Sequence, residues 1–324
     1  MADEILSVDD LTVRFHLKRG TLTAVNGVSF DIKRGETFGL VGESGSGKTV
    51  TARAIMKLVP TPPGEIPRGR VLFEGQDILK LDPEGIRALR GNKIAMVFQE
   101  PMSALNPVYT VGDQITDVLR TNLGMTRAEA RERAGDLLAL VGIPSARSRI
   151  DNYVHEFSGG MRQRVMLAMA LSCDPTFLIA DEPTTALDVT IQATILELIS
   201  SMIDRFGMSL LFITHNLGVV AHACDKIGVM YASHLVEMGT KEEIFANPQH
   251  PYTVGLLNSI PRLDAQTRYL TPIDGTVCNM LDPPKGCKFN PRCAHAMDRC
   301  REEIPVLKEI APGHLAACHL HDVQ

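Results

Sequence analysis

A glycine-rich segment that follows a short apolar run constrains the fold of this chain more than any other feature. Residues 38–41 (FGLV) predict a buried strand, residues 42–49 (GESGSGKT) a tight loop, and the residues up to about Val59 an amphipathic helix. Glycines let the backbone N–H groups of such a loop turn inward, and the following helix adds the positive end of its dipole. A loop of this kind suits phosphate groups. The sequence therefore predicts that the chain binds a nucleoside triphosphate here.

The positions of this loop have separate expected roles. Lys48 supplies a positive charge at the β and γ phosphates, and the Thr49 hydroxyl is a ligand for Mg²⁺. A chance glycine-rich turn is the alternative, and the strand and helix that flank the loop argue against it. The residues expected to contact the nucleotide are Gly42, Glu43, Ser44, Gly45, Ser46, Gly47, Lys48, Thr49 and Val50.

Two carboxylates end a second apolar strand, residues 177–180. Unpaired charge beside a buried strand is costly, so Asp181 and Glu182 need a purpose, and a metal-bound phosphate provides one. We expect Asp181 to hold Mg²⁺, directly or through water, and Glu182 to orient and polarise the attacking water. A strand that simply ends at a solvated acidic turn is the alternative. The pair, together with the loop, predicts hydrolysis of the nucleotide.

A second anion site is expected at residues 158–163 (SGGMRQ). Ser158, Gly159 and Gly160 place a hydroxyl and two glycines at the N-terminus of a predicted helix, which favours anion binding for the same reason as the first loop. One chain rarely needs two γ-phosphate sites for one nucleotide. The second site therefore suggests a nucleotide shared between two chains, each of which contributes one half.

The remaining periodicity predicts an α/β fold. Two helices are expected at residues 111–123 and 127–141, where apolar residues recur at helical spacing. Strand and helix then alternate to about residue 231, which is typical of a parallel sheet with helices on its faces. From about Pro248 the chain is rich in Pro, Cys and His, so we expect a separate small module. The expected strands are residues 11–15, 28–32, 38–41, 71–75, 94–98, 177–180, 209–214 and 227–231, with helices between the last three.

Composition limits the class of protein. A length of 324 residues predicts a large domain with a smaller appendage, and a net charge of −5 argues against nucleic acid as the main partner. The chain has no apolar run of about 18 residues or more, and its first residues lack the pattern of a signal peptide. We therefore expect a cytoplasmic protein.

The motifs together resemble the ATP-binding cassette (ABC) ATPases over residues 6–239. The resemblance rests on the order of the phosphate loop, VFQEP at 97–101, FSGG at 157–160, Asp181-Glu182, ALD at 186–188 and FITH at 212–215. It implies an α/β P-loop NTPase with a RecA-like parallel-sheet core, an N-terminal antiparallel β subdomain and an α-helical signature subdomain at about residues 100–171. The implied cofactors are ATP and Mg²⁺.

The resemblance also assigns roles to residues that would otherwise read as ordinary strand ends. Gln99 senses the γ-phosphate and the metal, Asp188 lies at a dimer interface, and His215 contacts the γ-phosphate. Phe15 resembles the aromatic that stacks on adenine, although an insertion at residues 18–21 blurs the alignment and a core aromatic is the alternative. The implied catalytic set is Glu182, His215, Gln99 and Lys48, and the implied Mg²⁺ ligands are Thr49, Gln99 and Asp181.

Two positions depart from the family pattern. Met161 stands where glutamine is commonest after the signature, and Asn216 follows His215 where aspartate is usual. Neither change removes a phosphate donor or a catalytic carboxylate. We expect an active site, with Met161 as the mark of a subfamily.

Residues 100–107 (EPMSALNP), 247–253 (NPQHPYT) and 259–261 (SIP) resemble the oligopeptide, dipeptide and nickel importer branch. The resemblance implies a cassette at residues 1–246 and a C-terminal module at 247–324. It implies an ATPase subunit on the cytoplasmic face of the membrane, paired with a second ATPase, identical or paralogous, under two permeases served by a solute-binding protein. Residues 100–107 would touch a permease helix, or form a solvated loop.

Several functions remain open within this resemblance. Peptides are the expected cargo, and nickel or another small solute is the alternative. A soluble ABC ATPase without a transport role is a second class, but such relatives carry long coiled coils or two cassettes. An inactive regulatory subunit is a third, which the intact Glu182 and His215 oppose.

Seven cysteines are unevenly distributed. Cys173 and Cys224 lie in apolar helical stretches and are expected to be core residues, and Cys278 is expected to stand apart. The other four have the spacing Cys287-x5-Cys293-x6-Cys300-x17-Cys318, which resembles that of a 4Fe–4S cluster in this transporter branch. Zinc held with His295, His314 or His319, and unliganded thiols, are the alternatives. We expect a structural role for a bound centre, with redox sensing still open.

Overall fold

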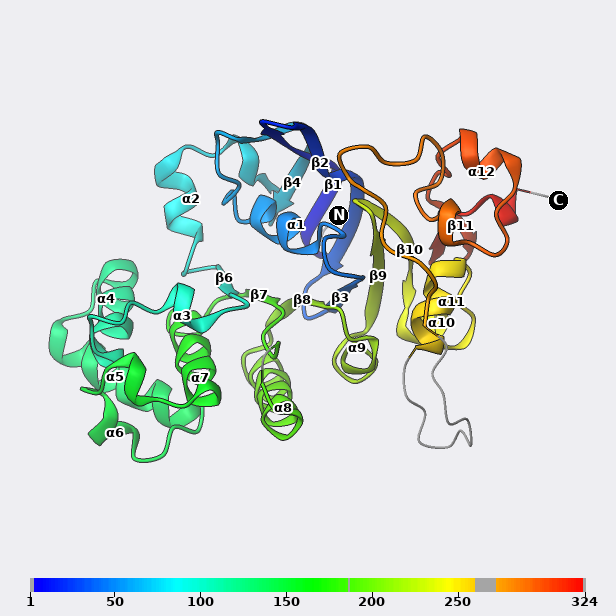
Figure 1. Ribbon diagram of the computed structural model, residues 1–324. Coiled ribbons are helices and arrows are strands. Elements are labelled where there is room, and N and C mark those ends of the chain that lie inside the picture. Colours follow the sequence, from blue (N-terminus) through cyan, green and yellow to red (C-terminus); the bar gives the residue numbers. More distant parts are fainter. Residues whose placement is uncertain (1–2, 186, 260–271, 323–324) are drawn as a thin grey trace. The chain divides into compact units, whose positions relative to one another are not determined.

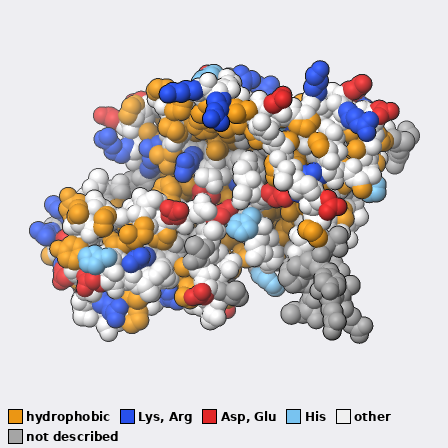
Figure 2. Space-filling model, in the orientation of Figure 1, with side chains coloured by type: hydrophobic (Ala, Val, Ile, Leu, Met, Phe, Trp, Pro, Cys, Tyr) orange, Lys and Arg blue, Asp and Glu red, His pale blue; other side chains and the backbone are white. Residues whose placement is uncertain are grey.

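The computed structural model describes residues 3–185, 187–259 and 272–322, which form two compact units. Unit 1 combines Met1–Leu79 with Phe212–Gln324, and unit 2 is Lys80–Leu211. Figure 1 shows the elements of each unit. No helix in the described part of the chain is long and apolar enough to cross a membrane. Acidic and basic side chains are interspersed on the face drawn in Figure 2.

Unit 1 begins with an antiparallel sheet. Strands β1 (Glu4–Leu17), β2 (Gly20–Lys33), β4 (Gly64–Phe73) and β5 (Gln76–Asp77) lie in the order β2-β1-β4-β5. The predicted antiparallel β subdomain is present, but its strands are longer than the sequence indicated. The pairing of β1 with β2 shifts register between Val8 and Val13, near Asp10 in a left-handed conformation. Such bulges interrupt the strict alternation on which the prediction of 11–15 relied.

A second group of strands in unit 1 carries the loop. Strand β3 (Thr37–Val41) pairs in parallel with β9 (Lys226–Tyr231), as predicted. Strand β10 (His234–Thr240) then pairs antiparallel with β9, β12 (His314–Ala316) with β10, and β11 (Lys308–Ala311) with β12. The antiparallel strands β10, β11 and β12 lie after the region in which parallel pairing was expected, and the sequence analysis did not predict them.

The helices of unit 1 are short. They are α1 (Lys48–Ile55), α9 (Leu217–Ala223), α10 (Lys241–Ala246), α11 (Pro251–Asn258) and α12 (Asp298–Glu302), with 3₁₀ turns η3 (Asn290–Arg292) and η4 (His319–His321). Helix α9 packs against β3 at Gly39, where a Cβ would lie 2.1 Å from Val220 Cγ1. Helix α1 ends earlier than expected, because Lys57 adopts a left-handed conformation.

Unit 2 is mainly helical. Its helices are α2 (Pro83–Leu89), α3 (Pro101–Ala104), α4 (Val111–Leu123), α5 (Arg127–Leu140), α6 (Ala146–Arg149), α7 (Gly159–Ala170) and α8 (Val189–Phe206), with the 3₁₀ turn η2 (Val154–Glu156). A further 3₁₀ turn, η1 (Ile78–Lys80), runs across the unit boundary. Strands β6 (Ile94–Val97) and β7 (Phe177–Asp181) pair in parallel, and β8 (Ser209–Thr214) runs across the unit boundary. The helices expected at 111–123 and 127–141 are confirmed. Thr110 and Thr126 cap their N-termini through their side chains.

The structure groups the C-terminal residues with unit 1 and does not support the separate small module that the sequence suggested. Glu237 of β10 pairs with Ala316 of β12, so this segment extends the sheet of unit 1. The domain boundary at residue 246 stays a prediction. Two residues of the motif at 259–261 lie outside the described residues.

Candidate functional site

The backbone of the phosphate loop lies close to two strands. Gly42 has φ +154° and Gly47 has φ +106°. A Cβ at Gly42 would lie 2.1 Å from the carbonyl oxygen of Met230, and one at Gly47 would lie 2.3 Å from that of Ala24. Only glycine fits these two positions, so the loop keeps its backbone close to β2 and β9.

Lys48 lies at the centre of this loop. Its side chain is buried, and its Nζ donates to the carbonyl oxygens of Gly42 at 2.7 Å and Glu43 at 3.0 Å. The Ser46 hydroxyl lies 3.4 Å from the same ammonium, and Thr49 follows in the first turn of α1. The loop therefore folds around one cation at a helix N-terminus, which is suited to an anionic ligand.

Residues far along the chain hold the second residue of the loop. The Glu43 N–H donates to the Tyr252 hydroxyl at 2.9 Å, and the Glu43 carboxylate accepts from both Nη atoms of Arg292 at 2.7 and 3.1 Å. The hydrogen bond to Glu43 raises the pKa of Arg292. Sequence reasoning missed both partners, since no local pattern relates positions more than 200 residues apart.

The acidic pair of unit 2 is buried at the end of β7. Asp181 is 2% exposed and Glu182 is 8% exposed, and Glu182 adopts a left-handed φ of 46°. The Glu182 Oε2 accepts from Gln99 Nε2 at 3.1 Å and from Thr185 Oγ1 at 2.9 Å. Gln99 and Glu182, singled out separately in the sequence, are thus brought together, whereas Thr185 was missed. Strained backbone of this kind concentrates at functional sites.

The signature residues begin α7. The Ser158 hydroxyl accepts from the Met161 N–H at 3.4 Å, and both Ser158 and Gly159 are exposed. Gly160 is buried, and a Cβ there would lie 2.7 Å from Ile191 Cγ2 of α8. This glycine therefore permits close helix packing inside unit 2, in addition to its expected role at an anion site.

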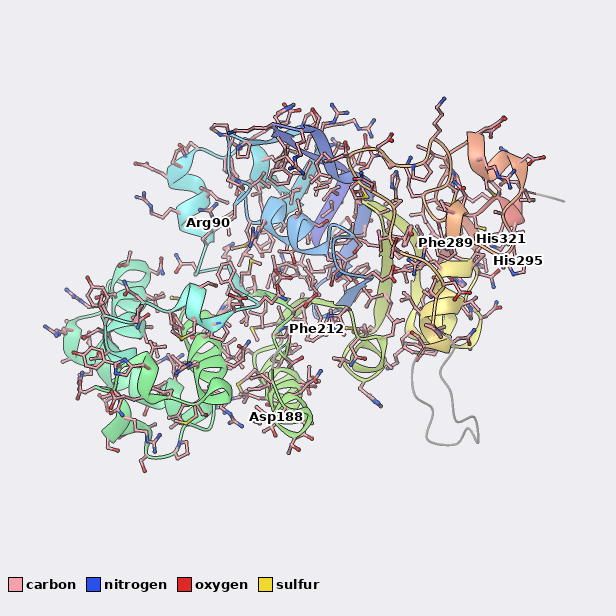
Figure 3. All side chains as sticks on the ribbon, in the orientation of Figure 1. Arg90, Asp188, Phe212, Phe289, His295 and His321 are labelled. Atoms are coloured by element: carbon pink, nitrogen blue, oxygen red, sulfur yellow. The ribbon has the colours of Figure 1, made fainter. Side chains whose placement is uncertain are left out.

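The structure places most of the other predicted site residues, and their roles stay predictions. Asp188 occupies the N-cap position of α8 (Figure 3), and Ala186 lies outside the described residues. His215 is exposed directly after β8, and Phe15 is half-buried on β1. Asn216 has a structural function, because its side chain accepts from the Gly218 N–H at 2.9 Å and caps α9.

Four cysteines converge in unit 1. Cys287, Cys293, Cys300 and Cys318 line one small cavity, and Cys278 is not among its lining residues. Burial raises the pKa of the Cys318 thiol to about 11. Over residues 3–185, 187–259 and 272–322, no group of three or more His, Cys, Asp or Glu is arranged to hold a metal ion. The predicted iron–sulfur or zinc centre is therefore not confirmed. Cys173 and Cys224 are buried, as expected.

The histidines offered as zinc ligands have other partners. His314 Nε2 lies 2.8 Å from Glu237 Oε1. His319 Nδ1 lies 2.8 Å from Asp322 Oδ2, and its Nε2 lies 3.1 Å from the Glu303 carbonyl oxygen. Both ring nitrogens of His319 are thus engaged, so the structure does not support it as a zinc ligand, whereas the contact of His314 occupies one of its two ring nitrogens. His295, His319 and Phe289 line the cysteine cavity, and His295 and Phe289 are labelled in Figure 3.

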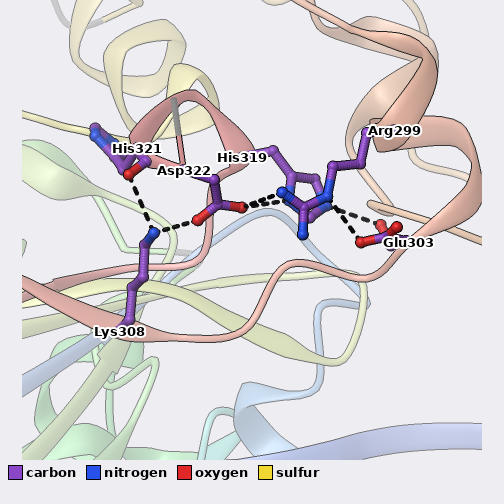
Figure 4. A network of polar contacts seen from close by, with 6 residues as sticks. All are labelled: Arg299, Glu303, Lys308, His319, His321 and Asp322. Carbon is purple, nitrogen blue, oxygen red and sulfur yellow. Dashed lines mark hydrogen bonds and ion pairs between the residues drawn. The ribbon is translucent and has the colours of Figure 1, made fainter. Parts of the chain in front are cut away.

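A polar network fixes the segment that carries Cys318 (Figure 4). Asp322 accepts from His319 and Lys308, and from Arg299 Nη1 at 3.1 Å, and these contacts lower the pKa of its carboxyl to about 2. Arg299 belongs to α12, the helix that also contains Cys300. The network therefore holds Cys318 beside Cys300.

Comparisons with known proteins agree over nearly the whole chain. Residues 25–185 match the ABC transporter family, and residues 236–300 match the oligopeptide/dipeptide transporter C-terminal region. The chain is 49% identical to the dipeptide transport ATP-binding protein DppD of Bacillus subtilis, over 99% of this chain and 96% of that protein. It is 50% identical to the oligopeptide transport ATP-binding protein OppD of Salmonella typhimurium, over 98% and 94%.

Solved structures share the fold. A dimeric ATP-binding cassette in a post-hydrolysis state, bound to ADP and Pi, aligns with a TM-score of 0.65 and 25% identity, over 73% of this chain and 98% of that one. A component of an ABC transporter complex from Clostridium perfringens aligns with a TM-score of 0.64 and 29% identity, over 78% and 95%.

Proposed function

Since the chain belongs to the ATP-binding proteins of the ABC transporter family, in the branch that carries the oligopeptide/dipeptide transporter C-terminal region, we propose that it is the ATP-hydrolysing subunit of a peptide importer. The observation that carries the proposal is the glycine-constrained loop around the buried Lys48. The high identity to dipeptide and oligopeptide transport proteins, over both the cassette and the C-terminal region, supports peptides as the cargo.

The residues divide the chemistry between them. Lys48 and the loop amides of unit 1 would bind the phosphates, and the Thr49 hydroxyl would be an oxygen ligand for Mg²⁺. In unit 2, Gln99 and Asp181 are the residues that the family resemblance gives as further Mg²⁺ ligands. When bound, Mg²⁺ neutralises charge on the β and γ phosphates. Glu182 orients the attacking water and accepts its proton. Gln99 and Thr185 donate to Glu182 and so fix the direction of its carboxylate.

The signature acts on a second copy of the cassette. Ser158, Gly159 and Gly160 bind the nucleotide held by a partner chain, and the exposure of Ser158 and Gly159 leaves them accessible for this purpose. Asp188 lies at the same interface and His215 contacts the γ-phosphate. ATP binding draws two such chains together, and hydrolysis releases them.

The segment after Gln99 is suited to contact a membrane permease. In the described structure of unit 2, Met102, Val108 and Tyr109 are exposed apolar side chains around α3, at 48%, 71% and 52%. Exposed apolar groups of this kind mark interaction sites. We infer that two permease subunits at the cytoplasmic face of the membrane are the partners, and the names of the relatives as transport ATP-binding proteins support this.

In this proposal the four cysteines would hold a 4Fe–4S cluster. The support is that four thiols, the donors that such a cluster uses, line one small cavity. The ion pair between Arg299 and Asp322 joins the two segments that carry Cys300 and Cys318. Anaerobic purification followed by iron, sulfide and zinc analysis and a visible spectrum tests this. Brown protein with iron and sulfide is expected, and Cys300→Ser should lose both while Cys278→Ser keeps them. Colourless protein with stoichiometric zinc rejects the cluster.

The substitution Glu182→Gln tests the enzymatic part. It removes the proton acceptor and keeps the shape, so turnover at saturating ATP should fall by two orders of magnitude or more, while ATP binding persists. Glu197→Gln on the exposed side of α8 is the matched control and should keep turnover. Full turnover in Glu182→Gln would show that this carboxylate is not the base.

The cargo is tested by uptake. Cells with the permeases and this ATPase should accumulate a labelled dipeptide or oligopeptide, and Glu182→Gln should stop accumulation. Uptake of nickel with no uptake of peptide would replace peptide as the cargo and leave the ATPase assignment intact.

A further inference from the structure

Glu43 connects the phosphate loop to the C-terminal part of unit 1. Its carbonyl oxygen accepts from Lys48 Nζ, its N–H donates to Tyr252, and its carboxylate pairs with Arg292. All three functional groups of one loop residue are thus engaged, two of them by residues after position 250. A displacement of Tyr252 or Arg292 would therefore also move the Glu43 carbonyl oxygen, which accepts from the Lys48 ammonium.

Arg292 is a rigid partner for this carboxylate. Its side chain is only 5% exposed, its Nε donates to the Asp274 carbonyl at 2.9 Å, and its Nη2 donates to the Ile273 carbonyl at 3.2 Å. The guanidinium carbon also lies 5.9 Å from the ring centroids of Tyr231 and Phe289. A bidentate pair with a buried, fully engaged arginine fixes both the position and the direction of the carboxylate.

Tyr252 is held just as firmly. Its ring is fully buried, 4.6 Å from Tyr231 and 5.4 Å from Phe289 between centroids. The two amides before α11, those of Gln249 and His250, donate to the buried carboxylate of Glu237. The hydroxyl that meets the loop therefore comes from a helix whose own N-terminus is anchored.

The segment that carries Arg292 is bounded by two of the cavity cysteines. Phe289 and Arg292 lie between Cys287 and Cys293, and the Cys287 N–H donates to the Cys300 carbonyl at 2.8 Å. Any rearrangement of the backbone at these cysteines must move Phe289 or Arg292, because only a few bonds separate them. The structure thus provides a continuous path from the cysteine cavity to the loop.

We propose that Arg292 and Tyr252 are positioning residues for the phosphate loop. Through these two residues, the conformational order of residues 287–293 determines the affinity of the loop for ATP. The inference rests on the proposed function only in placing ATP in this loop. Linkage requires the reverse effect as well, so ATP must in turn order residues 287–293.

The first test measures ATP binding and turnover in the full-length protein. Arg292→Met and Tyr252→Phe should each raise Kd and KM for ATP, about tenfold for Arg292→Met, which corresponds to about 1.4 kcal/mol. Their kcat should change by less than about twofold, since neither residue touches the reacting atoms. Glu43→Arg combined with Arg292→Glu should restore part of the affinity. Arg301→Met is the control, because Arg301 pairs with Asp298 and is exposed.

The second test measures hydrogen exchange of the backbone amides. A purely structural role of Arg292 and Tyr252 would not make exchange in residues 287–293 depend on bound nucleotide. A nonhydrolysable ATP analogue should slow exchange in residues 287–293 of the wild type, and Glu43→Gln should abolish that protection while the fold persists. If Arg292→Met does not fold, Tyr252→Phe and Glu43→Gln decide the matter.

The outcomes separate the two proposals. A wild-type protein that binds no ATP would overturn the proposed function. A wild-type protein that binds ATP, with unchanged Kd in folded Arg292→Met, Tyr252→Phe and Glu43→Gln and no ATP-dependent protection of 287–293, would overturn the positioning role alone.

Discussion

The buried carboxylate of Glu237 gives the sharpest prediction for stability. Glu237 is 0% exposed and accepts three hydrogen bonds within unit 1. Its Oε1 accepts from the Gln249 N–H at 2.7 Å and lies 2.8 Å from His314 Nε2, and its Oε2 accepts from the His250 N–H at 2.9 Å. Glu237→Gln keeps the shape but replaces one acceptor oxygen with an NH₂ group, which then faces a buried donor.

The cost follows from the groups that lose their partner. A hydrogen bond to a charged acceptor contributes about 1.5–3 kcal/mol, and a buried donor without an acceptor costs about 1–3 kcal/mol. The two contributions together amount to about 2.5–6 kcal/mol. At about 2–4 °C per kcal/mol for a folding unit of this size, the melting temperature should fall by roughly 10 °C.

Urea unfolding followed by circular dichroism, together with thermal melting, measures this effect. The control is Glu242→Gln, an exposed carboxylate on the neighbouring helix α10, which should change stability by less than about 0.5 kcal/mol. His314→Gln combined with Glu237→Gln should cost less than the sum of the single changes, because both remove the same contact. A loss below about 1 kcal/mol in Glu237→Gln would refute the reasoning.

Three further substitutions test other features. Burial lowers the pKa of His250 to about 3, so the folded protein favours the neutral imidazole. The stability that depends on this neutral form is complete above pH 6.5 and is lost as the pH falls from there towards 3. The melting temperature of His250→Gln should therefore fall less steeply than that of the wild type between pH 7 and 4. Contacts with Lys308, His319 and Arg299 lower the pKa of Asp322 to about 2. The wild type should therefore have a higher melting temperature than Asp322→Asn at pH 7, and this difference should shrink as the pH falls from 4 to 2. A difference in melting temperature that is independent of pH would contradict this. Gly47→Ala should abolish ATP binding, because its Cβ would lie 2.3 Å from the carbonyl oxygen of Ala24. Gly35→Ala is the control, since Gly35 also has a positive φ but has open space around it among the described residues. It should bind ATP normally in the same titration.

The sequence predicted those helices and strands that are determined by neighbouring residues, such as capping residues and continuous apolar runs. The helix at 111–123 begins and ends where expected, because Thr110 caps it and Gly124 in a left-handed conformation stops it. Strand β8 was placed correctly from its continuous apolar run. Strand β10 was missed, since it is buried nearly throughout and carries the charged Glu237 at its middle, so neither alternation nor an unbroken apolar run was present.

The candidate site likewise has parts that the sequence predicted and parts that it did not. The loop and the acidic pair are short motifs whose chemistry can be read from neighbouring residues. The contact between Gln99 and Glu182 joins the segments that follow strands β6 and β7, and only the family resemblance related the two residues beforehand. The partners of Glu43 had no signal at all, because the pairing depends on how β9, β10 and α11 return the chain to the loop.

The ion pair between Glu43 and Arg292 also determines when during synthesis the loop becomes complete. The two residues lie 249 positions apart, and unit 2 is made between them. At roughly 5–20 residues per second, a ribosome releases the loop many seconds before its arginine is translated. Nascent chains, and chains truncated before that arginine, therefore carry a loop without its support. Under the positioning role proposed above, such incomplete chains bind ATP weakly and do not compete with finished subunits for nucleotide-driven pairing.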